Sequence, residues 1–114
     1  MTIQLAPGYW EAVERGIEIQ LRNYVSHPNI RMYETWLFES LSNAIEELAF
    51  FLKDDRFIMV ASAAVQLGFQ RFPAIARGIT TVEEFPVTEC AKLWTESLRL
   101  LFEKWQKQYP KGTL

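Results

Sequence analysis

Thiol and imidazole groups are scarce in this sequence, which has one cysteine, Cys90, and one histidine, His27. A cysteine nucleophile needs its thiolate stabilised by a base or a cation, and His27 is the one histidine that could act as that base. Cys90 falls beside Trp94 on the apolar side of a helical segment, where a free cysteine usually serves as a small buried hydrophobe. We therefore expect Cys90 to belong to the core.

Metal binding is disfavoured by the same composition. One cysteine cannot form a thiolate cage or an internal disulfide, and one histidine excludes the usual sites with several histidines. The neighbouring carboxylates Glu46 and Glu47, like Glu83 and Glu84, point in different directions on a helix. No Glu-x-x-His motif, which a di-iron helical bundle requires, is present. We expect neither a metal nor a cofactor.

One segment, Arg22-Asn23-Tyr24-Val25-Ser26-His27, combines side chains that can act on a phosphate. A cation stabilises negative charge on phosphorus, and a side chain that titrates near neutral pH can move the proton. The segment resembles the Arg, polar residue, spacer, His motif of HEPN domains, small α-helical bundles that often dimerise and in many members cleave RNA. The resemblance implies that Arg22 stabilises charge and His27 acts as general acid or base at a cleft between two chains.

Plainer roles are open for both residues. Arg22 stands four residues after Glu18, a spacing that allows a surface ion pair on a helix. His27 would end that helix, where a cation is favoured by the helix dipole. The same two residues therefore support either a ribonuclease site or an ordinary helix end.

Apolar residues recur at helical spacing of three and four in four segments. The expected helices are Tyr9–Val25, a long helix capped by Asn29 and ending at Lys53, Arg56–Phe72, and Val87–Gln108. Asp54 and Asp55 are expected to cap the third helix. The third helix is apolar almost all round, which favours a central position, although Phe57–Val60 could instead form a strand.

Between the third and fourth helices, the sequence predicts a folded connector. Ala74–Arg77 would form a short segment ended by Gly78, and Val82–Phe85 would form one helical turn behind a capping box. Because long helices with short connections bury their apolar sides best against one another, we predict an all-α fold. Residues 1–114 would form one domain, an antiparallel bundle of four main helices with this short helical connector.

Composition limits the environment and the partners of the protein. Of its residues 49% are hydrophobic and 23% charged, as in globular domains. The net charge of −2 gives no broad positive field for nucleic acid, so RNA binding is expected only under the HEPN hypothesis. The longest uncharged apolar stretch, Phe57–Phe69, is shorter than the ~20 residues that cross a bilayer, and no signal peptide is evident. We expect a cytoplasmic protein that does not enter a membrane.

Some large apolar residues lie off the main apolar sides of the predicted helices. Met32, Trp36 and Phe50 fall on a second line of the long helix, and Leu93 and Leu100 share an outer face of the last helix. Such residues favour an interface, although the connector could also cover them.

We therefore expect a non-enzymatic protein that acts in protein–protein interaction or regulation through these apolar helix faces, with a homodimer as the simplest assembly. The alternative is a HEPN-like ribonuclease or RNA-binding domain using Arg22 and His27. A third hypothesis, a carrier that holds a small ligand in its aromatic interior, stays open because residue spacing does not reveal pocket volume.

Overall fold

The structure, a computed structural model, describes residues 3–27, 30–70 and 87–109. This part of the chain is helical, without strands, and the prediction of an all-α fold is confirmed. Its helices are α1 (Tyr9–Ser26), α2 (Arg31–Leu52), α3 (Arg56–Gln70) and α5 (Val87–Gln108). The segment considered as a strand is helical. The predicted connector between the last two helices and the Asn29 cap lie outside the described residues, and Ile30 stands at the N-cap of α2.

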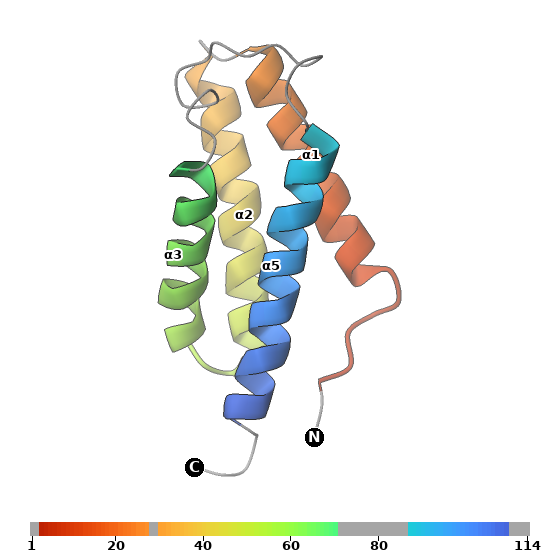
Figure 1. The fold of residues 1–114 in the computed structure, drawn as a ribbon, viewed down its shortest axis with the longest axis vertical. Helices are drawn as coiled ribbons and strands as arrows, with labels where there is room; N and C mark the ends of the chain where they lie inside the picture. Colours follow the sequence, from red (N-terminus) through yellow and green to blue (C-terminus); the bar gives the residue numbers. More distant parts are fainter. Residues whose placement is uncertain (1–2, 28–29, 71–86, 110–114) are drawn as a thin grey trace.

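Figure 1 shows the chain running upward through α1, downward through α2, upward through α3 and downward through α5. The helix α1 packs against α2 and α5, and α3 packs against the same two helices from the other side. The helices α2 and α5 touch each other less than either touches α1 or α3, and they lie diagonally across the assembly. Each helix therefore has neighbours on its inner side and an outer side that the other described helices leave free.

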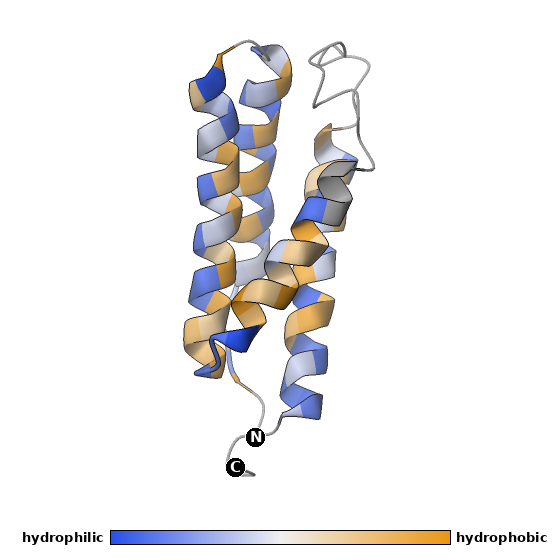
Figure 2. Cartoon of the chain, turned by 90° about the vertical axis from the view of Figure 1, so that its left-hand side faces the viewer, coloured by the Kyte–Doolittle hydropathy of each residue, from blue (hydrophilic) through white to orange (hydrophobic). Residues whose placement is uncertain are grey.

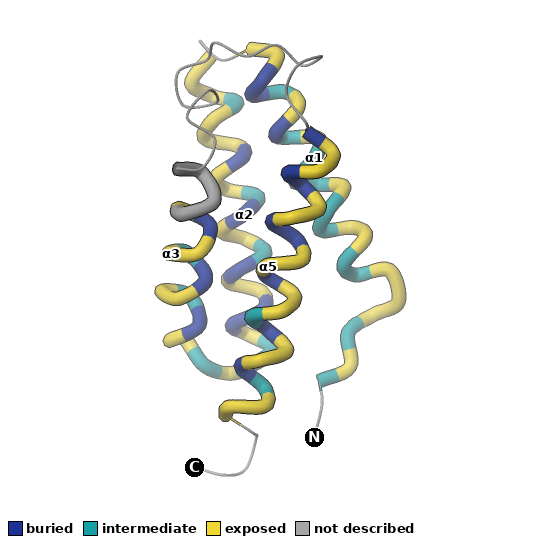
Figure 3. Tube along the Cα trace, in the orientation of Figure 1, coloured by how far each residue is buried: buried dark blue, intermediate teal, exposed yellow. Residues whose placement is uncertain are grey.

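The core forms where the inner sides of the four helices meet. Buried positions recur every three or four residues along each helix, as Figure 3 shows. Hydrophobic residues follow the same period in Figure 2, alternating with polar residues on the outer sides. Cys90 and Trp94 are buried as expected, Trp105 is buried as well, and Trp10 is partly buried with its ring centroid 6.1 Å from that of Phe102.

The expectation that α3 would be the central helix is wrong. Phe57, Ala61 and Val65 are buried, whereas Met59 is 79% exposed and Val60 44% exposed. The helix lies at the edge of the assembly and packs mainly against α2 and α5. Its sequence is apolar on the outer side as well as the inner side, so composition could not distinguish the two.

The turn between α2 and α3 reverses the chain within three residues. Lys53 adopts a left-handed backbone conformation, with φ 55°, although glycine is the usual residue there. The Lys53 N–H donates to the Phe50 carbonyl and the Asp54 N–H to the Ala49 carbonyl, both at 3.1 Å. These two hydrogen bonds form a Schellman motif that satisfies the last carbonyls of α2.

The Asp54 carboxylate then caps α3 and links this turn to α5. It accepts hydrogen bonds from the backbone N–H of Arg56 at 3.1 Å and from the Arg56 guanidinium at 2.9 and 2.6 Å. The Trp105 indole N–H donates to the same carboxylate at 3.1 Å. The Arg56 guanidinium also lies 4.5 Å above the ring centroid of Tyr109. Hydrogen bonding from Arg56, aided by Trp105, lowers the pKa of Asp54 below its usual value.

Replacing Lys53 by glycine should stabilise the protein. A left-handed conformation costs a residue with a side chain about 1–2 kcal/mol, part of which glycine loses again through the entropy of its unfolded state. We expect Lys53→Gly to raise the free energy of unfolding in urea by about 0.5–1 kcal/mol. Lys92→Gly is the control, because Lys92 lies inside α5 and should lose about 1 kcal/mol instead. Destabilisation by both variants would contradict the assigned backbone strain.

The Asp54 cap should make stability depend on acid pH. The pKa of Asp54 in the folded protein lies below the ~3.9 of an unfolded aspartate, so the carboxylate stabilises the fold above about pH 4. This contribution is lost as pH falls through the folded-state pKa. Urea unfolding from pH 6 to 2 should therefore show the wild type losing its advantage over Asp54→Asn as the solution is acidified. A constant difference between the two proteins at every pH would refute this role.

Candidate protein-binding surface

The large apolar residues expected on the outer faces are exposed. Their exposed fractions are 77% for Phe50, 65% for Leu100, 56% for Leu93, 50% for Met32 and 39% for Trp36. Each Å² of apolar surface left in water forgoes about 25 cal/mol of favourable burial. These side chains are therefore available to a partner.

The three apolar residues of α2 form two separate spots. Met32 and Phe50 point the same way but stand 18 residues apart, which is about 27 Å along the helix axis. Trp36 packs edge-on against Tyr33, whose ring centroid lies 5.0 Å from that of His27. Phe50 instead lies beside Phe51, at the other end of the helix.

Between these two spots, α1 and α2 enclose an open groove of about 440 Å³. Small residues line much of it, and a Cβ added to Gly16 would meet no atom within 4 Å. The Tyr9 hydroxyl reaches the groove, and its burial, reinforced by the nearby Glu47 carboxylate, raises the pKa of Tyr9. The lining residues are Tyr9, Ala12, Val13, Gly16, Ile17, Ser40, Asn43, Ala44 and Glu47.

The charges on α2 are of one sign for almost its whole length. After Arg31 the helix has no lysine or arginine. Its glutamates form no ion pair with any described residue. They are Glu34, Glu39, Glu46 and Glu47. The apolar residues of α2 therefore stand in an acidic surface.

The outer side of α5 carries both signs of charge. Leu93 and Leu100 are flanked by Glu89 towards the start of the helix and Lys104 towards its end, and all four are exposed. The other side of α5 is already engaged. There the Arg99 guanidinium pairs with Glu103 at 3.2 Å, and the Gln106 side chain accepts the Ile3 backbone N–H at 2.7 Å.

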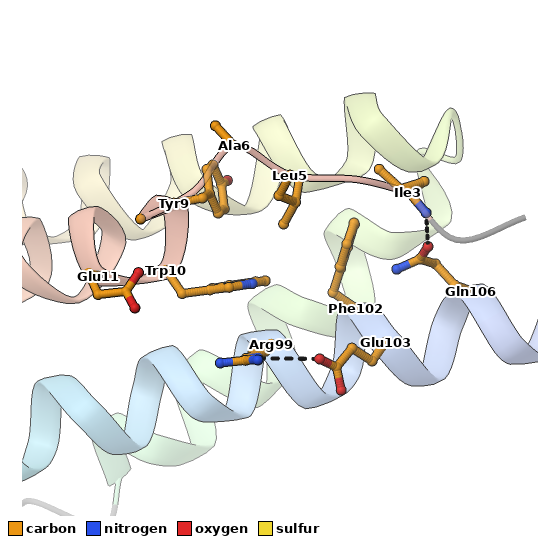
Figure 4. A pocket seen from close by; sticks show the side chains of 11 residues that line it. Ile3, Leu5, Ala6, Tyr9, Trp10, Glu11, Arg99, Phe102, Glu103 and Gln106 are labelled. Atoms are coloured by element: carbon orange, nitrogen blue, oxygen red, sulfur yellow. Dashed lines mark hydrogen bonds and ion pairs between the residues drawn. The ribbon is translucent and has the colours of Figure 1, made fainter.

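A pocket of about 320 Å³ lies where the residues before α1 cross between α1 and α5. Figure 4 shows Trp10 and Phe102 along one wall, Ile3 and Leu5 opposite them, and the ion pair of Arg99 with Glu103 at the rim. The chain enters α1 through Gly8, whose φ of 79° favours glycine. The helical period could not indicate this pocket, because residues 3–8 have no regular pattern. The small-ligand hypothesis stays a prediction.

The structure holds Arg22 and His27 apart within one chain. They stand five positions apart, Arg22 within the last turns of α1 and His27 at its C-cap, where the backbone is no longer helical. The Arg22 guanidinium pairs with Glu18 at 3.0 Å, and Glu18 also accepts the Thr88 hydroxyl at 3.0 Å. His27 is exposed, with its ring beside that of Tyr33. A shared cleft would need residues from two chains, so the ribonuclease hypothesis stays a prediction.

Cys90 lies in the core, as expected for a structural cysteine. It is 1% exposed, and burial, with a smaller effect of Glu89, raises the pKa of its thiol to about 11. No three histidine, cysteine or acidic side chains gather around a metal-sized space within the described ranges. Among those residues, no helix is both long and apolar enough to cross a membrane.

Comparison with known proteins gives no relative from which a function could be inferred. The chain matches no protein-family model, and no curated protein or solved structure resembles it significantly. The assignment of function therefore depends on the surface itself.

Burial should make the Cys90 thiol almost inert. With a pKa of about 11, little thiolate exists at pH 8, and the reagent must also reach a covered sulfur. We expect the folded protein to react with 5,5′-dithiobis(2-nitrobenzoate) at least about 100-fold more slowly than the chain unfolded in urea. Gln108→Cys in a Cys90→Ala background is the control, because Gln108 is exposed on the same helix. Equal rates for the two folded thiols would contradict the core position.

Proposed function

We propose that the protein acts without catalysis, by binding other polypeptide chains through the outward apolar residues of α2 and α5. The observation that carries this proposal is the exposure of Phe50, Leu93 and Leu100, each more than half open to solvent. Exposed apolar side chains do not stabilise the fold of the isolated chain, whereas an interface that covers them is stabilised by their burial. A free cysteine suits a reducing compartment, so we propose a cytoplasmic location.

The α2 surface, made of Met32, Trp36 and Phe50, suits a partner other than a second copy of the same surface. Tryptophan, methionine and phenylalanine are enriched at the centres of interfaces. The groove between the two apolar spots has room for side chains of an incoming helix. Because the glutamates of α2 lack ion-pair partners among the described residues, a partner bearing lysine or arginine would gain most there.

The α5 surface suits self-association, the homodimer expected for this chain. It has both an acidic and a basic side chain next to its leucines, so one copy can neutralise the charges of another. The two surfaces would then have separate roles, α5 joining copies of the protein and α2 binding a different protein.

Loss of Phe50 should abolish partner binding without harming the fold. We expect Phe50→Ser to lose at least about fivefold of any protein that the tagged wild type retains from an extract of its source cells, quantified by mass spectrometry. Because Phe50 is 77% exposed, the free energy of unfolding should change by less than about 0.5 kcal/mol.

Met59→Ser is the matched control, since Met59 is 79% exposed but belongs to α3. It should retain the same proteins as the wild type. Two results would count against the α2 surface: identical retained proteins for all three chains, or a stability loss for Phe50→Ser large enough to mark Phe50 as a core residue.

A further inference from the structure

The exposed residues of α5 form one straight line. Glu89, Leu93, Ser97, Leu100 and Lys104 are separated by three or four residues, so at 100° per residue they lie within about 40° of Leu93 around the helix. All five are exposed. We call this set the α5 stripe.

The α5 stripe is complementary to itself when two copies run in opposite directions. Consider a two-fold axis that crosses the stripe midway between positions 96 and 97. Each residue then faces the residue at the same distance on the other side of the axis. Leu93 faces Leu100 of the second copy, and Glu89 faces Lys104 of the second copy. In an isologous dimer the same surface of both copies forms the interface, so the surface must be complementary to itself and each contact occurs twice.

Among the described residues, neither charge of the stripe, Glu89 or Lys104, has an ion-pair partner. Their carboxylate and ammonium groups are free to pair across the axis, about 11 Å along the helix on either side of it. Opposite charges flanking a pair of leucines set both the direction and the register of two helices.

The centre of the stripe allows close approach. Ser97 is small and exposed, so it does not hold the two helices apart. Glu96 lies about 60° to one side of Leu93, and two copies of it would face each other near the axis. Lys92, four residues before Glu96, shares that side and offsets part of the repulsion. The central charges therefore weaken the contact without preventing it.

Other outer surfaces fit a second copy less well. An antiparallel pairing of α2 about Asn43 would bring Glu39 of one copy against Glu47 of the other, and α2 has no basic residue after Arg31 to offset this. The opposite side of α5 is covered by α1 and by residues 3–8. On α3, Met59 and Val60 are exposed but carry no charge that would fix an orientation.

We propose that two copies of this chain form a symmetric dimer through antiparallel contact of their α5 stripes, with Leu93 against Leu100 and Glu89 against Lys104. The proposal rests on the function proposed above, in which exposed apolar residues are binding surfaces, and specifies the partner of α5. Two leucine–leucine contacts and two ion pairs make a small interface, so the dimer should dissociate in the micromolar range.

Exchange of the two charges tests the register directly. In sedimentation velocity from 5 to 500 µM, the wild type should show a reversible monomer–dimer equilibrium. Lys104→Glu and Glu89→Lys should each raise the dissociation constant at least about tenfold, because each places like charges together. The double variant restores opposite charges and should return to within about threefold of the wild type. Arg15→Glu, the same change of charge on the exposed outer side of α1, should leave the dimer unchanged.

The outcomes separate this inference from the function proposed for α2. A wild type that stays monomeric at 500 µM would overturn the dimer, while the Phe50 experiment would still decide the α2 surface. A dimer that tolerates Lys104→Glu and Leu100→Ser would show that the copies join elsewhere. A double variant as weak as the single variants would overturn the antiparallel register. Circular dichroism of each variant confirms that any loss of the dimer is not a loss of the fold.

Discussion

Burial of one side of α5 is the constraint from which the other features of the structure follow. This helix touches each of the other described helices, and its inner side places Trp94, Leu98 and Phe102 in the core. A helix turns 100° per residue, so residues one position before Trp94 and two positions after Leu98 cannot share that side. Leu93 and Leu100 must then face outward. Their exposure is a consequence of the core packing, and none of the other described helices covers them.

The rotation of α5 about its own axis decides which way its outer face points. This rotation is fixed by the hydrogen bond between Trp105 of α5 and Asp54 in the turn after α2. Asp54 caps α3 and accepts the Trp105 indole N–H, so one carboxylate joins the end of α2, the start of α3 and the last turns of α5. The ring of Phe57 lies edge-on to Trp105, with 5.5 Å between centroids, and covers this link from the core. Rotation of α5 would break the hydrogen bond and expose the indole. The outer face of α5 is therefore fixed as firmly as the core.

Helical periodicity was sufficient to predict the helices and their inner sides, because burial follows the same period. Leu37, Leu41 and Leu48 are buried as their spacing indicated, and Cys90 with Trp94 lies in the core. The position of α3 was predicted wrongly, because a helix that is apolar all round has no polar side to mark which side faces water. The contact between Ile3 and Gln106 joins residues far apart in the sequence, and no periodic pattern indicates such a pair.

The exposed residues could be identified from the sequence, but their grouping required the structure. Met32 and Phe50 share a face and stand about 27 Å apart by helical periodicity, but the groove between them depends on how α1 packs against α2. The pairing of Arg22 with Glu18 was indicated by spacing, whereas the contact of Glu18 with Thr88 depends on how α1 meets α5. The charges distinguish the α2 surface from the α5 surface only once the ion pairs are known, because a glutamate that is already paired with a cation attracts a second cation weakly.

The diagonal placement of α2 and α5 allows both surfaces to be occupied at once. The two helices touch each other less than either touches α1 or α3, so their outer sides face away from each other. A dimer joined through α5 would leave the α2 surface of each copy open, and the pair would present two acidic, apolar surfaces on opposite ends of one assembly. A partner with two matching segments would then bind the second segment at a high effective concentration. A small and weak α5 contact can thus increase the affinity of the α2 surface without touching it.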